Sequence, residues 1–158
     1  GIGNTAVLMN EYNQELSETL RRFLDNIGYR GYSTFDIKYD QRDGRYKILE
    51  INLRQGRSNY YVTAGGNNLA QYVVEDYIYN KNQQLEIANV RNLWTAIPLG
   101  VAFRYVRGSE NLEQMRQLVR EKRVTHPLFL KGDNKPKRML FLYKWQLSHY
   151  FKFRKYLK

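Results

Sequence analysis

The chain has 158 residues, of which 42% are hydrophobic and 26% are charged. This length gives room for one domain with an appendage, and this composition is that of a foldable chain rather than a disordered one. The absence of cysteine excludes disulfides, thiol catalysis and thiolate zinc sites. No run of about 18 apolar residues predicts a membrane-spanning helix, and the first residues lack the pattern of a secretory signal. We therefore expect a cytoplasmic protein.

The formal net charge of +11 is concentrated in a basic tail. Residues 131–158 hold nine Lys and Arg against one acid, which accounts for +8 and leaves +3 for the first 130 residues. The net charge alone would favour a nucleic-acid partner, but this distribution weakens that interpretation. Because the body is nearly balanced, we expect no specific nucleic-acid partner.

The first predicted element is an amphipathic helix over residues 10–27. Its apolar residues recur at helical spacing, Asn10 suits the N-cap position, and Gly28 suits the position just beyond the last turn.

Two alternating runs follow, residues 31–40 and 45–53, separated by Gln-Arg-Asp-Gly, and this pattern predicts a β-hairpin.

The loop of this hairpin decides which side chains share a face, because a shift of one residue inverts the faces of a strand. A two-residue turn at Asp43 and Gly44 would put Asp36 and Glu50 on opposite faces. A three-residue loop, with Gly44 left-handed in a bulge, pairs residue 36 with 50 and residue 38 with 48. We predict this second register, because it gathers the polar side chains on one face.

The rest of the chain predicts an α+β fold: an antiparallel sheet with helices packed on it. Residues 56–68 are expected to form a loop, 68–79 a helix, 80–92 a connector and 93–107 an extended segment broken at Pro98. A helix over 110–122 with Ser109 as its cap, a short strand over 124–130 and a helix over 139–157 complete the prediction. In this last helix, one apolar stripe is expected to pack on the body: Leu140, Tyr143, Leu147, Tyr150 and Phe151.

Asp36, Glu50 and Asn52 form the first candidate site. Two carboxylates and an amide oxygen on adjacent strands suit Mg²⁺, which prefers hard oxygen ligands, and Lys38 and Arg54 beside them could hold phosphate charge. The alternative is a solvated face with ion pairs such as Lys38 with Glu50. Asn52 favours the metal site, because Asn is a poor strand former and gains nothing from a ladder of ion pairs.

Three further features are weaker. Arg57 and Ser58 follow Gly56 in "RQGRSNYY", a loop that could orient a carboxylate substrate or be an ordinary basic loop. Gly65 and Gly66 precede a helix but lack the remaining residues of a known phosphate-binding loop. The basic aromatic tail could lie on RNA or on an anionic membrane surface, although docking of its apolar stripe on the body is the preferred interpretation.

The stretch "GYRGYSTFDIKYDQRDGRYKILEINLRQGRSNYY" resembles the C-terminal half of an ATP-grasp ligase. In that superfamily a hairpin ends in Glu-x-Asn, often with Arg two residues on, and an acid or amide on the preceding strand completes the magnesium site. The continuation "EINLRQGRSNYYVTAGG" is similar to bacterial carboxylate–amine ligases related to D-aspartate ligase, which builds peptidoglycan cross-bridges. The detailed resemblance covers residues 28–79.

This resemblance implies that ATP and Mg²⁺, or Mn²⁺ in its place, are the cofactors. Glu50 would bridge two ions, with Asp36 on one and Asn52 on the other; Glu50, Asn52 and Arg54 would contact the nucleotide. Arg54 and Lys38 would be the catalytic cations. The resemblance further implies that Arg57 and Ser58 hold a small carboxylate such as an amino acid. That acid would be activated as an acylphosphate and joined to an amine, with a peptidoglycan precursor as one candidate.

The resemblance also predicts a division of the chain. Residues 1–80 would form the C-terminal ATP-grasp subdomain with the metal-binding hairpin, and residues 81–158 an extension ending in the basic tail helix. No segment matches the first ATP-binding subdomain, so we expect a piece of a longer ligase that is inactive alone. The predicted localisation is cytoplasmic, and peripheral contact of the tail with a membrane is left open.

Overall fold

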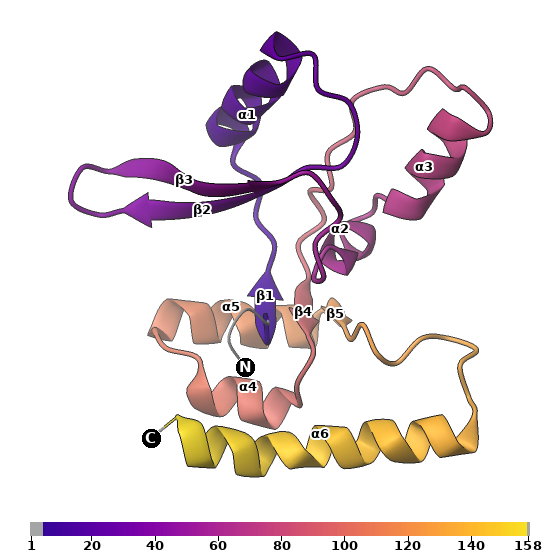
Figure 1. Cartoon of the computed structure of the whole chain (residues 1–158). Coiled ribbons are helices and arrows are strands. Elements are labelled where there is room, and N and C mark those ends of the chain that lie inside the picture. Colours follow the sequence, from indigo (N-terminus) through magenta and orange to yellow (C-terminus); the bar gives the residue numbers. More distant parts are fainter. Residues whose placement is uncertain (1–4, 158) are drawn as a thin grey trace. The chain divides into compact units, whose positions relative to one another are not determined.

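The computed structural model describes residues 5–157 and has an α+β fold, as predicted (Figure 1). The chain divides into two units. One consists of residues 11–59, and the other combines the strand before it with residues 60–157. The boundary at residue 80 was predicted from the resemblance to ATP-grasp ligases, as the end of a subdomain, and it stays a prediction.

The first unit is a helix on a two-stranded hairpin. It contains α1 (Gln14–Asn26), β2 (Thr34–Asp40) and β3 (Arg45–Asn52). Asn13, and not Asn10, caps α1: its side chain accepts a hydrogen bond of 2.9 Å from the Leu16 N–H. Gly28 adopts φ +64°, and the Tyr29 N–H bonds the Leu24 carbonyl, which closes the helix as predicted.

The hairpin has the predicted pairing at its base and a different one near its loop. Asp36 pairs with Glu50, but Lys38 pairs with Lys47 and not with Ile48. The loop therefore has four residues, 41–44, with Gly44 left-handed at φ +68°. The register changes between Asp36 and Ile37, where Leu49 is the extra residue of a β-bulge. The predicted three-residue loop is wrong, because the extra residue lies within β3 rather than beside the turn.

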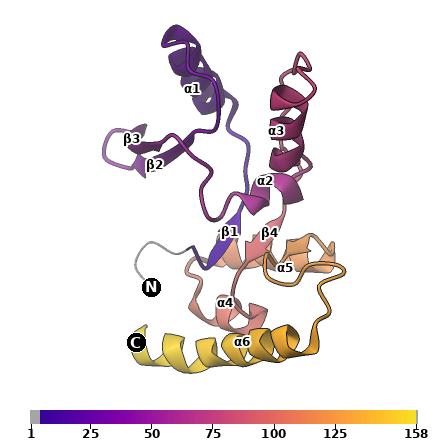
Figure 2. The ribbon, with the colours of Figure 1, turned by 45° about the vertical axis from the view of Figure 1, so that its right-hand side comes forward.

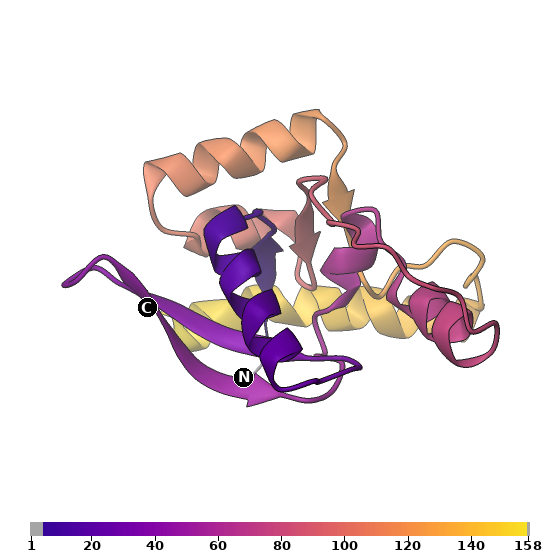
Figure 3. The same ribbon diagram turned by 90° about the horizontal axis from the view of Figure 1, so that it is seen from above.

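The second unit surrounds a small mixed sheet. In this sheet β4 (Leu93–Thr95) lies between β1 (Val7–Met9), which is antiparallel to it, and β5 (Val124–Thr125), which is parallel. The helices are α2 (Tyr60–Ala64), α3 (Leu69–Tyr77), α4 (Leu99–Tyr105), α5 (Ser109–Arg120) and α6 (Pro136–Tyr156). In Figures 1 and 3, α4 lies between α5 and α6. The core brings together β4, α4, α5 and the bend between β4 and α4: Leu93, Ile97, Val101, Ala102, Met115 and Leu118.

Several local predictions in this unit are wrong. Residues 60–64 are helical rather than part of a loop, and residues 99–105 form α4 rather than an extended segment, because Val101 and Ala102 pack into the core. Ser109 begins α5 but gives no side-chain cap, and the strand at 124 has two residues. The helix after Asn68 and the irregular connector over 80–92 are as predicted.

The stripe of α6 that was expected to pack on the body does so only in part. Leu142, Gln146 and His149 are buried on the packed face, and Phe153 meets Tyr105 of α4 with ring centroids 5.4 Å apart. Three members of the predicted stripe lie on the other side of the helix and are exposed: Leu140, Leu147 and Phe151. Tyr143 and Tyr150 are also exposed in part, but Tyr143 meets Phe129 with ring centroids 5.5 Å apart, and the Tyr150 hydroxyl lies beside Gly100. Within residues 5–157, no helix is long and apolar enough to cross a bilayer.

Candidate functional site

The polar face of the hairpin is the face turned away from α1. Phe35 of β2 contacts Phe23 of α1, with ring centroids 6.3 Å apart, so one face of the sheet is covered (Figures 1 and 3). Successive side chains on a strand point to opposite faces, which puts Asp36 on the other one. Asp36 lies directly opposite Glu50, and Asn52 lies opposite Thr34 on the same face. The register thus gathers the two predicted carboxylates and the amide.

The two carboxylates of this pair have no cationic partner among the described residues. No ion pair within residues 5–157 involves Asp36 or Glu50, and both residues are exposed. Like charges directly opposite each other on neighbouring strands destabilise the pairing. The predicted alternative, an ion pair between Lys38 and Glu50, is therefore not what the structure shows.

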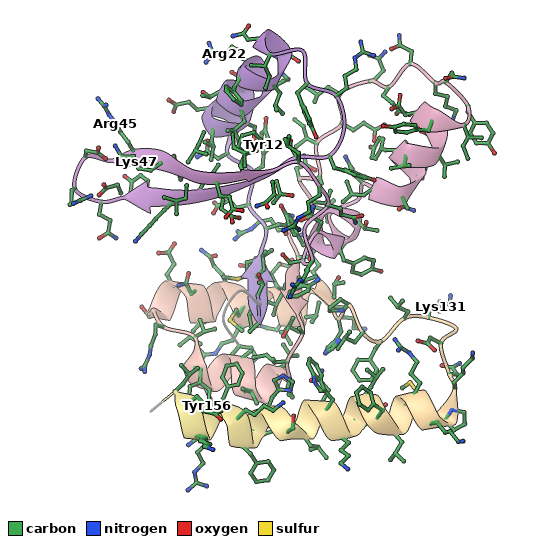
Figure 4. All side chains as sticks on the ribbon, viewed as in Figure 1. Tyr12, Arg22, Arg45, Lys47, Lys131 and Tyr156 are labelled. Carbon is green, nitrogen blue, oxygen red and sulfur yellow. The ribbon has the colours of Figure 1, made fainter. Side chains whose placement is uncertain are left out.

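The other two acids of the hairpin behave differently. Asp40 pairs with Arg42 at 2.7 Å, and this hydrogen bond holds the pKa of the carboxyl below its usual value. Asp43 pairs with Lys47 at 2.5 Å, which lowers the pKa of that carboxyl in the same way. Near the loop, carboxylates are neutralised within the hairpin, whereas at its base they are not (Figure 4, where Lys47 is labelled).

Lys38 shares the polar face with Asp36, two residues along β2. Its cross-strand neighbour is Lys47, so the bulge at Leu49 puts two lysines opposite each other and directly beside the two opposed acids. Lys47 is engaged with Asp43, while Lys38 has no ion-pair partner within the described residues 5–157. The Lys38 ammonium, which has no ion pair among the described residues, thus lies on the same face as the Asp36 and Glu50 carboxylates and two residues from Asp36.

The loop after β3 is tied back to the start of β2. The Thr34 hydroxyl donates to the Arg54 carbonyl at 3.3 Å, and the Asn59 side-chain amide donates to the same hydroxyl oxygen at 3.3 Å. A Cβ added at Gly56 would stand 2.8 Å from the Asn59 side-chain oxygen, so a side chain there would push Asn59 from its place. These contacts keep Arg54 and the residues after it at the base of the hairpin.

Sequence reasoning missed Thr34 and Asn59 as positioning residues. Their polar side chains differ little from those of any loop, and only the observed hydrogen bonds distinguish them. Arg57 is exposed and Ser58 is half-buried within the same loop. Whether Arg57 and Ser58 hold a carboxylate stays a prediction.

The donor set fits a hard divalent cation. Mg²⁺ is usually bound through one or two carboxylates, with the remaining positions taken by water and phosphate oxygens. Asp36 and Glu50 supply two such carboxylates and Asn52 an amide oxygen. The described residues contain no cluster of three or more His, Cys, Asp and Glu side chains that could hold a metal ion.

Gly65 and the two histidines, His126 and His149, have structural roles. Gly65 is buried, and a Cβ there would stand 3.2 Å from Ala88 and 3.3 Å from the Asn10 amide. His126 contacts the Gln146 amide at 3.0 Å, and burial lowers the pKa of His126. His149 is bonded to the Trp145 carbonyl at 2.9 Å. These residues pack the second unit.

The sequence comparisons point to one kind of protein. No family model matches the chain, and no solved structure matches it. The chain is similar to the D-aspartate ligase of Enterococcus faecium (strain Aus0004), with 39% identity over 161 residues. This match covers 98% of the chain, which spans 38% of the length of that relative. The chain is thus similar along nearly its whole length to part of a ligase.

Proposed function

We propose that the chain is the C-terminal portion of an ATP- and Mg²⁺-dependent carboxylate–amine ligase that forms an amide through an acylphosphate. The observation that carries this proposal is the opposed pair Asp36 and Glu50, which has no ion-pair partner within residues 5–157. A bound cation would offset the repulsion between these carboxylates. The similarity to D-aspartate ligase supports the reaction class.

Asp36, Glu50 and Asn52 would hold Mg²⁺, or Mn²⁺ in its place, with Glu50 shared between two ions. When bound, the ions neutralise phosphate charge and hold the triphosphate of ATP for in-line transfer. The protein oxygens come from two paired strands, so the hairpin fixes the distance between Asp36 and Glu50 before any ion binds. The remaining contacts to ATP are expected from the rest of the longer ligase.

Lys38 and Arg54 would act as the two cations of the site. Phosphoryl transfer involves little acid–base chemistry and depends on positioning and on compensation of charge. The Arg54 guanidinium can hold two oxygens of the transferring phosphoryl group or of a tetrahedral intermediate, because its donors form a rigid fork. Lys38 would hold a phosphate oxygen as a point charge.

Arg57 and Ser58 would hold the carboxylate that is activated, and an amino acid is the substrate class that their size and charge suit. The amine that opens the acylphosphate would come from a second substrate, for which we propose a peptidoglycan precursor. This last step is supported by the similarity to D-aspartate ligase and by the resemblance of residues 28–79 to ligases of cross-bridge formation.

Residue-by-residue NMR of the 158-residue chain with Mn²⁺ tests the metal site. We expect paramagnetic broadening centred on Asp36, Glu50 and Asn52, which ATP extends toward Arg54 and Arg57. The variant Glu50→Gln keeps the shape of the side chain and removes its charge, and it should abolish the broadening.

Asp43→Asn is the matched control, because Asp43 lies in the same hairpin but is paired with Lys47. This variant should leave the broadening at the base of the hairpin unchanged. Broadening that is absent from the base, or that Asp43→Asn removes as completely as Glu50→Gln, would show that the opposed carboxylates are not the metal site.

A further inference from the structure

Helix α6 has two faces with different surroundings. On one face, Leu142 and His149 are buried and the Gln146 amide donates to the Ala96 carbonyl at 2.8 Å. Phe153 also contacts Tyr105 of α4. These contacts fix α6 against the rest of the second unit, where it lies beside α4 (Figure 2). The rotation of α6 about its axis is therefore set by packing, and the opposite face is held toward solvent.

The opposite face carries an apolar line, here called the outer stripe: Leu140, Leu147 and Phe151. Their spacing of seven and four residues puts them on one side of an α-helix. They are 73%, 62% and 77% exposed. Large apolar side chains gathered on one face, rather than scattered singly, mark an interaction surface.

The outer stripe is flanked by positive charge. Lys137, Lys144 and Lys155 lie next to it on the helix surface, and Lys152 and Arg154 add two further cations. No acid occurs from residue 134 to the end, and Asp133 is paired with Arg138. Within residues 5–157, none of the five cations forms an ion pair. Figure 4 labels Lys131 and Tyr156, which both lie in the basic tail.

The combination of aliphatic and cationic groups favours a lipid surface over the other partners. Single-stranded nucleic acid stacks on aromatic side chains, whereas two of the three members of the outer stripe are leucines. A second copy of the chain would bring the same basic surface against itself in a symmetric dimer, which like charges oppose. An anionic bilayer offers negative headgroups beside an apolar interior, and it complements both features.

We propose that α6 docks on the surface of an anionic phospholipid bilayer. The helix lies in the headgroup layer, with the outer stripe directed toward the acyl chains and the flanking lysines at the level of the lipid phosphates. The packed face of α6 stays on the protein body, so docking requires no unfolding. Such docking would hold the second unit at a membrane surface without any membrane-spanning segment.

Co-sedimentation of the 158-residue chain with lipid vesicles tests this proposal. We expect tight binding to vesicles of phosphatidylcholine and phosphatidylglycerol in equal parts, and weak binding to phosphatidylcholine alone. Replacing Lys144 and Lys155 by Gln should weaken binding about fivefold for each lysine. The same double change at Arg22 and Arg45, two exposed arginines outside α6, is the charge control and should have a smaller effect (Figure 4).

A second set of variants separates apolar insertion from charge alone. The triple variant of the outer stripe to Ser should weaken vesicle binding at least about tenfold. A control triple variant, Ile78→Ser, Tyr79→Ser and Leu85→Ser, removes side chains that are 66%, 66% and 74% exposed in another segment. This control should bind vesicles as the unchanged chain does. Both variants alter exposed side chains, and their thermal unfolding should match that of the unchanged chain.

Three results would overturn the proposal. The first is equal binding to anionic and neutral vesicles. The second is equal binding of single-stranded RNA and anionic vesicles, with neither changed by the outer-stripe variant. This result would indicate a general affinity for polyanions. The third is a doubling of the mass in solution that the outer-stripe variant abolishes, with no vesicle binding, which would make the stripe an interface between copies.

Discussion

Asn10 joins two segments that are far apart in the sequence. Its side-chain oxygen accepts from the Asn92 backbone N–H at 2.6 Å and from the Asn92 amide at 3.1 Å, and its own amide donates to the Val90 carbonyl at 2.9 Å. The residue is 8% exposed. Its bond to the Asn92 backbone N–H satisfies a donor that would otherwise be desolvated without a partner. Its position before an apolar helical pattern suggested a cap, but its partners lie about 80 residues away.

We expect Asn10→Ala to lower the free energy of unfolding by about 2–3 kcal/mol, because it leaves the Asn92 backbone N–H without a partner and leaves the Val90 carbonyl with only a bond of 3.4 Å from the Asn92 amide. Urea unfolding followed by tryptophan fluorescence measures this loss, because Trp94 and Trp145 are both in the same unit as Asn10. Asn89→Ala, an exposed change in the adjacent connector, should cost less than about 0.5 kcal/mol. Equal costs for the two variants would contradict the role given to Asn10.

At the scale of the elements, α1 and the base of the hairpin could be predicted because sequence-local signals agree there. Apolar residues at helical spacing indicate α1, and Gly28 supplies the left-handed residue that ends it. The pairing of Asp36 with Glu50 follows from the demand that polar side chains share a face. The bulge at Leu49 could not be predicted, because alternation shows which residues lie in a strand but not where one extra residue is placed.

Long-range packing determines the elements that were predicted wrongly from the sequence. The segment 99–105 contains residues with strand preference, yet burial of Val101 and Ala102 in the core stabilises a helix there. In α6, apolar residues occur on both faces, so periodicity could not tell which face would pack. The buried Gln146, which bonds the Ala96 carbonyl, marks the packed face, and nothing in the sequence distinguishes it from an exposed glutamine.

The packed face of α6 carries a dependence on pH. His126 lies against the Gln146 amide, and its pKa is lowered from 6.5 chiefly by burial; His149 of α6 lowers it further. The unfolded chain therefore binds a proton at a higher pH than the folded one. Stability should be fully present above the ordinary histidine pKa and should be lost as the pH falls through the lowered value.

Urea midpoints measured between about pH 7.5 and about pH 5 should thus fall more steeply for the unchanged chain than for His126→Gln. The comparison isolates His126, because every other titrating group is common to both proteins. Identical slopes would mean that His126 is protonated equally in the folded and unfolded chains. A steeper slope for His126→Gln would contradict the sign of the effect.

At the scale of the whole molecule, the polar face of the hairpin and the outer stripe of α6 belong to different units. The basic tail accounts for +8 of the net charge of +11, whereas the hairpin base carries unpaired acids. Positive charge favours an anionic membrane surface, whereas two neighbouring carboxylates without an ion-pair partner favour a cation, so the two surfaces suit different ligands. Changes in one surface should leave the binding of the other surface's ligand unaffected.

In the longer ligase that we propose contains this chain, Glu50→Gln should lower kcat/KM for amide formation by about a thousandfold. The change keeps the hydrogen-bonding shape of the side chain but removes the charge that would hold the metal ions and, through them, the phosphates. Rates measured over a range of Mg²⁺ concentrations separate the two contributions. Weakened metal binding is partly restored by high Mg²⁺, whereas a misplaced phosphate is not. Asp43→Asn is the control, because the Asp43 carboxylate is paired with Lys47 away from the hairpin base. This variant should change kcat/KM by less than about twofold. Full turnover by Glu50→Gln would rule out the metal site at the hairpin base.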